Sequence, residues 1–387
     1  MALPTLVTIT GTTPGETFTG DNSNEVFSLV SNKGTGDIRN FVVKGEGGND
    51  TLTLVGAPVE TNVFGNDGDD LISVENKGTG AIIDSKFFAG DGDDTLLLED
   101  VVFTGTGAGT SQIGMAGGDD VVALRGRFNN VNLFTGDGDD FIAFSEPSSF
   151  RNGRAFTGDG DDIFADGGFE VDFTNTELGF KGGDDQIDLT SSITGSGDNG
   201  LTVFLGDGDD DFFGPKSGDL ELSAGDGDDS IEGGGGSDTL TGGEGADIFF
   251  QVEGYSASVA SVQGGQGNVP LTLTFTAQPD IITDFETEAS AGAPADRIGF
   301  VGWAGPADFS DNRSSASSSF GSGNVVLYSG TFNATGNIFT TTNNNAGPDV
   351  LAFLSTGTGS STSDFGDQAF VLLDASDQSF SADTDFI

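Results

Sequence analysis

The chain has 387 residues, enough for one large domain or two ordinary ones. Its 62 acidic and 13 basic residues give a formal net charge of -49, which argues against direct binding to nucleic acid or to anionic membrane surfaces. Without Cys or His, the chain cannot form disulfides, thiolate metal sites, HExxH zinc sites or a Ser-His-Asp triad.

The expected elements begin with residues 1–19, which we assign as an N-terminal cap strand. This segment lacks the basic region and the apolar run of a Sec-type signal peptide, so we expect any export to depend on a signal elsewhere. No stretch approaches the ~18 apolar residues of a membrane span. With 64 Gly and 34 Phe residues but few Lys or Glu, the chain favours strands and turns over helices.

A turn rich in Gly and Asp recurs along residues 20–253, and its fullest form is Gly-Asp-Gly-Asp-Asp at residues 90–94. Successive turns are mostly 19 to 26 residues apart, and the last two spacings are 9 residues. Recurrence of this kind predicts a solenoid in which each coil packs on its neighbours. The final acidic residues of the turns are Asp50, Asp70, Asp94, Asp120, Asp140, Asp162, Asp185, Asp210, Asp229, Asp238 and Asp247.

A large apolar residue stands two positions after each of these eleven aspartates, from Leu52 in the first repeat to Phe249 in the last. Alternation with a period of two after a turn predicts a strand whose apolar side chains point into the coil. A solvated, disordered Asp/Gly linker is the alternative interpretation, but disorder would not maintain this position.

A second ladder precedes the turns, because Phe stands six residues before the final Asp in five repeats. These residues are Phe64, Phe88, Phe134, Phe156 and Phe204. Parallel strands ~4.8 Å apart would stack their rings into a column. The residues just before them are often apolar as well, as at Val63 and Phe87, and strand neighbours face opposite ways. One of the two ladders should therefore lie at a corner or point outward.

Residues 233–240 (GGGGSDTL) and 242–249 (GGEGADIF) match the GGxGxDxU nonapeptide at every defined position. Through these turns, roughly residues 20–250 resemble the repeats-in-toxin, or hemolysin-type, calcium-binding proteins. The resemblance implies an all-β fold, a parallel β-roll in which several Ca2+ ions lie between adjacent turns. The sixth-position Asp and backbone carbonyls would hold each ion.

The resemblance makes the eleven final aspartates the candidate calcium ligands. In six turns we also assign the first Asp of an Asp-Gly-Asp-Asp core, namely Asp67, Asp91, Asp137, Asp159, Asp207 and Asp226. The turns ending at Asp120 and Asp185 lack this first Asp, and the turn ending at Asp50 reads GEGGND, so these three depart from the pattern. Residues 20–25 (GDNSNE) resemble a decayed first turn that caps the stack.

The coils are wider than the 18 residues of a standard roll, because most carry one acidic turn per 19 to 26 residues. Their opposite turns are irregular, at residues 76–78, 105–107 and 195–197. We therefore predict a parallel β-solenoid with widened coils and calcium along one edge, which becomes two-edged only near residues 229–250. A C-terminal β-rich cap region, residues 254–387, should follow.

The chemistry of the turns favours calcium. Gly lets the backbone adopt positive φ, and Asp supplies the hard oxygen ligands that calcium prefers. Carboxylates ~5 Å apart repel by roughly 3 kcal/mol per pair at an effective dielectric of ~20, so the stack should close only when cations neutralise it. Binding and folding should then be one event, at the millimolar calcium concentrations found outside cells.

In the C-terminal region, residues 271–275 alternate as a strand, and residues 279–285 followed by 296–298 resemble the segment that follows the roll in this family. The last residues, 382–387, are acidic and then apolar, as in the type I secretion signal of the family. Trp303 and Tyr328 are candidates for stacking on a sugar.

These features favour a secreted calcium-binding structural protein that is not an enzyme and that self-associates into an extracellular layer, filament or matrix. A calcium-dependent adhesin that binds a cell-surface polysaccharide is the alternative. A carboxylate-based, polysaccharide-active enzyme is a second alternative, because it needs only paired acids. Catalytic aspartates are disfavoured, since repeated equivalent turns form a lattice of sites and not one pocket.

Overall fold

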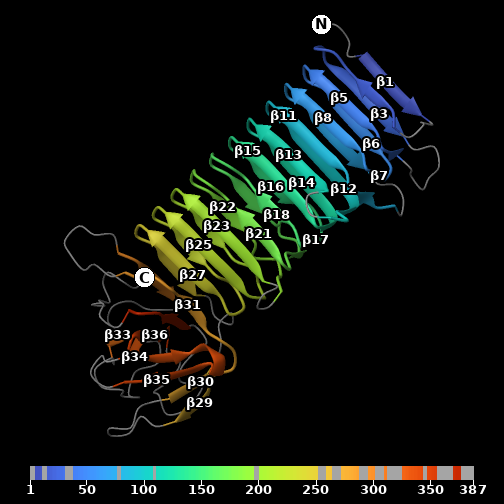
Figure 1. Cartoon of the computed structure of the whole chain (residues 1–387). Coiled ribbons are helices and arrows are strands. Elements are labelled where there is room, and N and C mark those ends of the chain that lie inside the picture. Colours follow the sequence, from blue (N-terminus) through green and yellow to red (C-terminus); the bar gives the residue numbers. More distant parts are fainter. Residues whose placement is uncertain are drawn as a thin grey trace. The chain divides into compact units, whose positions relative to one another are not determined.

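The computed structural model describes residues 5–10, 15–30, 38–75, 80–107, 110–195, 200–251, 259–263, 272–286, 295–300, 309–311, 325–342, 347–354 and 369–375. The chain divides into two compact units, Met1–Thr202 and Val203–Ile387. In both units the strands of the repeats pair in parallel with those of the next coil, and Figure 1 shows them as successive rungs. The predicted fold class, an all-β parallel solenoid, is confirmed.

Two parallel sheets build unit 1. The upstream sheet holds the strands that enter the acidic turns: β2 (Thr17–Thr19), β5 (Val42–Gly47), β8 (Asn62–Asp67), β11 (Lys86–Asp91), β13 (Ser111–Gly117), β15 (Val131–Asp137), β18 (Arg154–Phe156) and β21 (Thr176–Gly179). The downstream sheet holds β1 (Thr5–Thr10), β3 (Glu25–Val30), β6 (Thr51–Val55), β9 (Leu71–Glu75), β12 (Thr95–Thr104), β14 (Val121–Asn129), β16 (Phe141–Phe144), β19 (Ile163–Ala165) and β22 (Gln186–Asp188). Five further strands extend it: β4 (Ile38–Arg39), β7 (Pro58–Val59), β10 (Ile82–Ile83), β17 (Ser148–Arg151) and β20 (Val171–Asp172).

The core of unit 1 lies between these two sheets. On the downstream sheet, the residue two positions after each acidic turn is buried, and its neighbours on adjacent strands are in register, as Ile72 is with Leu96. On the upstream sheet, Val63 and Phe87 are fully buried. Because strand neighbours alternate, the phenylalanines that follow them point outward, and Phe134 is 40% exposed. The outward position of one ladder is confirmed.

The corner opposite the acidic turns uses residues with left-handed backbone conformation. Asn130, Asn152 and Asn175 have φ values of 56°, 54° and 54°, which Asn tolerates better than most residues. The side-chain amide of Asn175 donates to Oδ1 of Asn152 at 2.8 Å, so neighbouring corners are linked. Residues 76–78 and most of residues 195–197 lie outside the described part of the chain.

Unit 2 continues with parallel coils and ends in an antiparallel sheet. Its parallel strands are β23 (Leu201–Asp207, which begins at the end of unit 1), β24 (Asp211–Phe213), β25 (Leu220–Asp226), β26 (Ser230–Glu232), β27 (Thr239–Glu244), β28 (Ile248–Gln251), β31 (Asp280–Ile282) and β32 (Arg297–Phe300). The remaining elements are β29 (Val259–Gln263), β30 (Thr272–Phe275), β33 (Phe309–Asp311), β34 (Val325–Asn333), η3 (Ala334–Gly336), β35 (Ile338–Thr341), β36 (Asp349–Leu354) and β37 (Ala369–Leu372). Strands β31 and β32 stack in parallel on β27 and β28.

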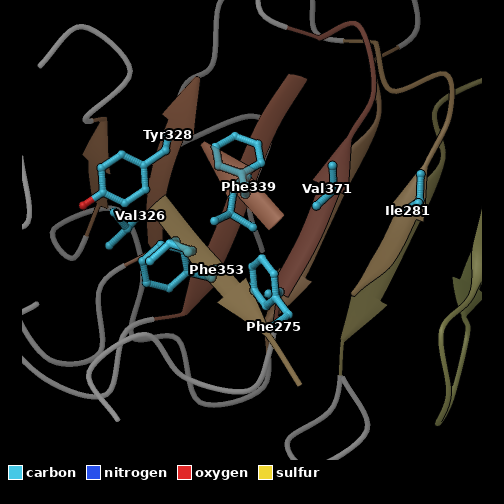
Figure 2. Packing of buried hydrophobic residues seen from close by; sticks show 10 residues of the cluster. Phe275, Ile281, Val326, Tyr328, Phe339, Phe353 and Val371 are labelled. Atoms are coloured by element: carbon cyan, nitrogen blue, oxygen red, sulfur yellow. The ribbon is translucent and has the colours of Figure 1, made fainter. Parts of the chain in front are cut away.

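The antiparallel sheet of unit 2 has its own apolar core, shown in Figure 2. Tyr328 on β34 is fully buried, and its ring stacks on Phe353 at a centroid distance of 6.1 Å. The interpretation of Tyr328 as a sugar-stacking residue is therefore wrong, because the ring is part of the core. The expected strand at residues 271–275 is present as β30. Trp303 and residues 382–387 lie outside the described residues.

Candidate metal centre

The sixth-position aspartates of unit 1 form one column of buried carboxylates. In each turn the backbone N–H of this aspartate donates to Oδ1 of the equivalent aspartate in the next coil. The distance is 2.7 Å from Asp50 to Asp70 and 2.8 Å from Asp94 to Asp120. The same bond recurs through the rest of the unit, as far as Asp162 to Asp185 at 2.8 Å. Residues up to 26 apart in sequence are thus joined one above another.

Unit 2 carries such columns on both edges, as the sequence predicted for residues 229–250. On the first edge, the N–H groups of Asp229 and Asp247 donate to Asp247 and Asp296, at 3.0 Å and 3.1 Å. On the second edge, the N–H of Asp238 donates to Oδ1 of Asp280 at 3.1 Å. The short nine-residue spacing therefore marks the point where the opposite edge acquires its own acidic turn.

In seven of these aspartates the second carboxylate oxygen has no hydrogen-bond partner. Oδ2 is buried and unpaired in Asp50, Asp70, Asp94, Asp120, Asp229, Asp238 and Asp247. An unpaired buried polar atom costs ~1–3 kcal/mol, and more when it is charged, so a whole row of them requires an explanation. A cation shared between turns would supply it.

The space beside these oxygens is built from oxygen donors. A Cβ added to Gly65, the first residue of its turn, would overlap both Oδ2 of Asp70 and the carbonyl oxygen of Ala89 in the next coil. Gly45 is placed in the same way against Asp50 and the carbonyl of Gly65. A carboxylate and a carbonyl from adjacent coils thus converge where glycine leaves room. Hard oxygen donors of this kind fit Ca2+ and not a softer metal.

Backbone conformation explains the glycines later in each turn. Gly90 and Gly92 have φ values of 123° and 135°, which side chains other than glycine rarely allow. A Cβ on Gly92 would also strike the carbonyl oxygen of Gly68 in the preceding coil. The turns therefore stack backbone on backbone, and the N–H of Gly68 donates to the carbonyl of Asp91 at 2.8 Å.

The comparison with known families agrees with this geometry. The family described as RTX calcium-binding nonapeptide repeat (4 copies) matches residues 221–250, the segment with acidic turns on both edges. This chain carries RTX repeats. It binds several calcium ions through these repeats. No match was found among curated proteins or among solved structures.

The RTX turns hold few carboxylates per site. Among the described residues, no three or more His, Cys, Asp or Glu side chains gather into a metal-binding cluster. Each ion would therefore depend on one or two aspartates and on backbone carbonyls, which suits weak sites of the extracellular kind. In the same part of the chain, no helix is both long enough and apolar enough to cross a membrane.

Burial raises the pKa of the RTX carboxylates far above the ordinary value of Asp. The pKa is raised to about 7 in Asp70, to about 8 in Asp94 and to about 7 in Asp120. Loss of solvent is the largest cause, the backbone N–H bond opposes it, and repulsion from neighbouring carboxylates adds to it. On the second edge of unit 2, burial also raises the pKa values of Asp238 and Asp280.

The six third-position aspartates are exposed; five are the last residues of strands that enter the turns, and Asp159 follows the end of β18. They are Asp67, Asp91, Asp137, Asp159, Asp207 and Asp226. The carboxylate of Asp159 pairs with Nζ of Lys181 at 2.6 Å. Their assignment as calcium ligands remains a prediction, and they are separate from the buried column.

The fifth-position residues form another, exposed ladder that runs in the reverse direction. The N–H of Asp119 donates back to Oδ1 of Asp93 at 3.0 Å, and the N–H of Asp139 donates back to Asp119 at 3.0 Å. Each pair of coils is thus joined by one bond in each direction. The sequence analysis did not single out this row, although the paired Asp-Asp at the end of most turns shows it.

The predicted first turn does stand at the head of the column. Glu25 is buried, and its N–H donates to Oδ1 of Asp50 at 2.7 Å. Its carboxylate accepts bonds from the Ser23 hydroxyl at 2.7 Å and from the Asp21 N–H at 3.3 Å. In contrast to the aspartates below it, Glu25 therefore has both oxygens satisfied within its own turn.

Sequence analysis missed two members of the columns in unit 2, Asp280 and Asp296. Both are buried, and each continues a ladder of backbone-to-carboxylate bonds. Neither follows a Gly-Asp turn, so the search for that turn could not find them. The apolar residue two positions later, Ile282 or Ile298, is the signal they share with the other repeats.

Proposed function

We propose that this RTX-repeat protein is a secreted structural protein that folds on calcium and then assembles into an extracellular layer, filament or matrix. The row of buried, unpaired carboxylate oxygens, as in Asp70, Asp94 and Asp120, carries the proposal. Without cations the row is a stack of desolvated negative charges, and with calcium it is neutralised at every coil. Calcium then decides whether the core between the two sheets closes.

We assign the calcium ions to the sixth-position aspartates and to carbonyls of the first turn residues, such as Ala89 beside Asp70. In a compartment with submicromolar calcium the chain would stay open, and millimolar calcium outside the cell would fill the sites. This suits export through a type I system that reads residues 382–387. The division into a cap strand (1–19), a calcium solenoid (20–253) and a C-terminal β region (254–387) belongs to the same proposal.

An uncharged apolar patch supports assembly. On the outer face of the downstream sheet, Val121, Phe141 and Ile163 lie in register on β14, β16 and β19 and are 38%, 41% and 38% exposed. In a chain with a net charge of -49, a neutral patch is where two copies can approach with least repulsion. Contiguous exposed apolar side chains commonly mark interaction surfaces. We call these three residues the apolar patch.

Two measurements test the proposal. Far-UV circular dichroism during a calcium titration should show β structure forming with calcium and disappearing with EGTA. Negative-stain images of the full chain at high calcium should show ordered assemblies, which the F141T/I163T variant of the apolar patch should reduce. Ser73→Thr, on the same face but outside the patch, is the matched control. Dispersed monomers at high calcium would refute assembly, and full structure in EGTA would refute calcium-dependent folding.

We propose no catalytic role. The carboxylates that could act as acid and base are repeated along the columns and engaged by backbone N–H groups, as Asp70 and Asp94 are. Equivalent sites of this kind form a lattice and not one pocket. Release of sugars from acidic or neutral polysaccharides by the purified chain would contradict this assignment.

A further inference from the structure

The outer face of the upstream sheet in unit 1 carries a row of outward-facing phenylalanines that we call the aromatic strip: Phe64, Phe88, Phe134 and Phe156. Phe134 is 40% exposed, and the other three are half-buried. The four residues lie in register along the stack, interrupted by Gly114 between the two pairs. Within each pair the rings are nearly parallel, with centroid distances of 5.6 Å and 6.0 Å and interplanar angles of 19° and 15°. The strip is separate from the carboxylate columns and from the apolar patch.

Glycines in the next coil leave room for two of these rings to pack against the surface of the sheet. Gly114 is beside Phe88 in the next coil, and a Cβ on Gly114 would come within 2.7 Å of the Phe88 ring. Gly179 is placed in the same way beside Phe156. Phe88 and Phe156 therefore each lean over a residue without a side chain, and Phe64 and Phe134 stack on these two rings. A ring in this position offers a flat face, and not only an edge, to a ligand.

A polar row runs beside the aromatic strip, two residues earlier on each strand. Its members, in register from β8 to β18, are Asn62, Lys86, Gln112, Asn132 and Arg154. Lys44 stands at the head of the aromatic strip, in register with Phe64. From β5 to β18 these two outward rows therefore contain three cations and no acidic residue, in a chain with 62 acidic and 13 basic residues. Glu177 continues the polar row in the next coil, and its Oε2 pairs with Nε of Arg154 at 3.1 Å. The charge of this face favours an anionic partner.

We propose that this face binds a linear acidic polysaccharide that runs across the strands, along the direction in which the coils stack. The same groups repeat at the strand spacing of ~4.8 Å, which is comparable with the length of one sugar unit in an extended chain. Ring faces pack against the C–H faces of pyranoses, amides bond to hydroxyls, and cations pair with carboxylate or sulfate groups. A ligand with repeating units can meet all these rows at once.

A second copy of the chain fits this face less well. Its acidic edge would offer carboxylates to Lys86 and Arg154, but the exposed residues of that edge are mainly Asp, Asn and Gly. Such residues cannot cover the rings of the aromatic strip. A sugar chain supplies the apolar and the anionic surface together, and binding to it goes beyond the structural role proposed above.

The test uses the full chain in saturating calcium with hyaluronate, a linear carboxylated polysaccharide, and neutral hydroxyethylcellulose as probes in affinity electrophoresis. The wild type should be retarded by hyaluronate. Phe88→Thr combined with Phe134→Thr should weaken this binding at least tenfold, and Lys86→Gln combined with Arg154→Gln should weaken it several-fold and reduce its salt dependence. Circular dichroism must show that each variant folds; a single F134T variant replaces the pair if it does not.

The F141T/I163T variant of the apolar patch is the matched control, because it should lose assembly and keep hyaluronate binding. No binding of hyaluronate by the wild type, or equal binding by the Phe88/Phe134 variant, would overturn the proposal. Equal retardation by hydroxyethylcellulose would show that binding does not require an anionic polymer, and would overturn the assignment of an acidic ligand. Loss of self-association in the Phe88/Phe134 variant, with hyaluronate binding unchanged, would make a second copy the occupant and also overturn it.

Discussion

Replacing Asp120 with Asn should have opposite effects on stability in the presence and absence of calcium. Asp120 is 1% exposed, and its Oδ1 accepts the N–H of Asp94 at 2.8 Å. Asn keeps this acceptor, but its amide nitrogen takes the place of Oδ2, which has no hydrogen-bond partner. The substitution therefore removes a charge and a candidate calcium ligand while it retains the ladder.

The magnitudes follow from the pKa. Burial raises the pKa of Asp120 from 3.8 to about 7, so at pH 8 the ionised carboxylate costs the metal-free fold about 4 kcal/mol at 1.36 kcal/mol per unit. The buried amide of Asn loses ~1–3 kcal/mol through its unpaired donors. Without calcium, D120N should thus gain about 1–3 kcal/mol. With calcium, the loss of a partner from a buried ion pair should cost ~3–5 kcal/mol.

Unfolding followed by circular dichroism measures both effects, with urea in saturating calcium and with a stabilising osmolyte series in EGTA at pH 8. Asp119→Asn is the matched control, because Asp119 is adjacent but exposed. The control should shift stability by no more than ~0.5 kcal/mol in either condition. A D120N effect of the same sign with and without calcium would refute the reasoning.

Three further predictions concern the whole fold, the core and the turns. The metal-free fold should gain stability as the pH falls from 8 to 4, because carboxylates such as Asp94, with a pKa raised to about 8, take up protons on folding. Circular dichroism in EGTA measures this, and less structure at pH 5 than at pH 8 would contradict it. Leu98→Ala, at a fully buried site, should lower the free energy of unfolding by ~2–5 kcal/mol in urea with calcium, whereas Leu97→Ala on the outer face should lower it much less. Equal losses would contradict the inward position of Leu98 on its strand. Gly92→Ala, at φ 135°, should cost ~1–3 kcal/mol or more by the same assay, and Gly107→Ala, which has open space apart from Thr110, should be nearly neutral.

The acidic turns and the apolar residues after them were enough to predict the solenoid, its inward face and the stacking of the acidic turns on one another. The sequence could not decide which of Val63 and Phe64 faces inward, because both are apolar and only the length of the turn sets the strand face. The sequence also could not show that Asp70 is buried and Asp67 exposed, since both belong to the same Asp-Gly-Asp-Asp motif. Asp280 was missed because its coil contains an insertion in place of the glycine turn.

The ladder of backbone-to-carboxylate bonds has a polarity, and this polarity makes the two ends of a stack of coils chemically different. The backbone N–H of each sixth-position residue donates to the sixth-position carboxylate of the next coil. The carboxylate of the first coil therefore receives no such bond, and the N–H of the last coil has no carboxylate to which it can donate. Glu25 solves the first problem by folding back onto Ser23 and the N–H of Asp21. Coils excised at turn boundaries would carry complementary ends, and therefore extra copies of a coil can be inserted into a stack of coils without a new kind of contact.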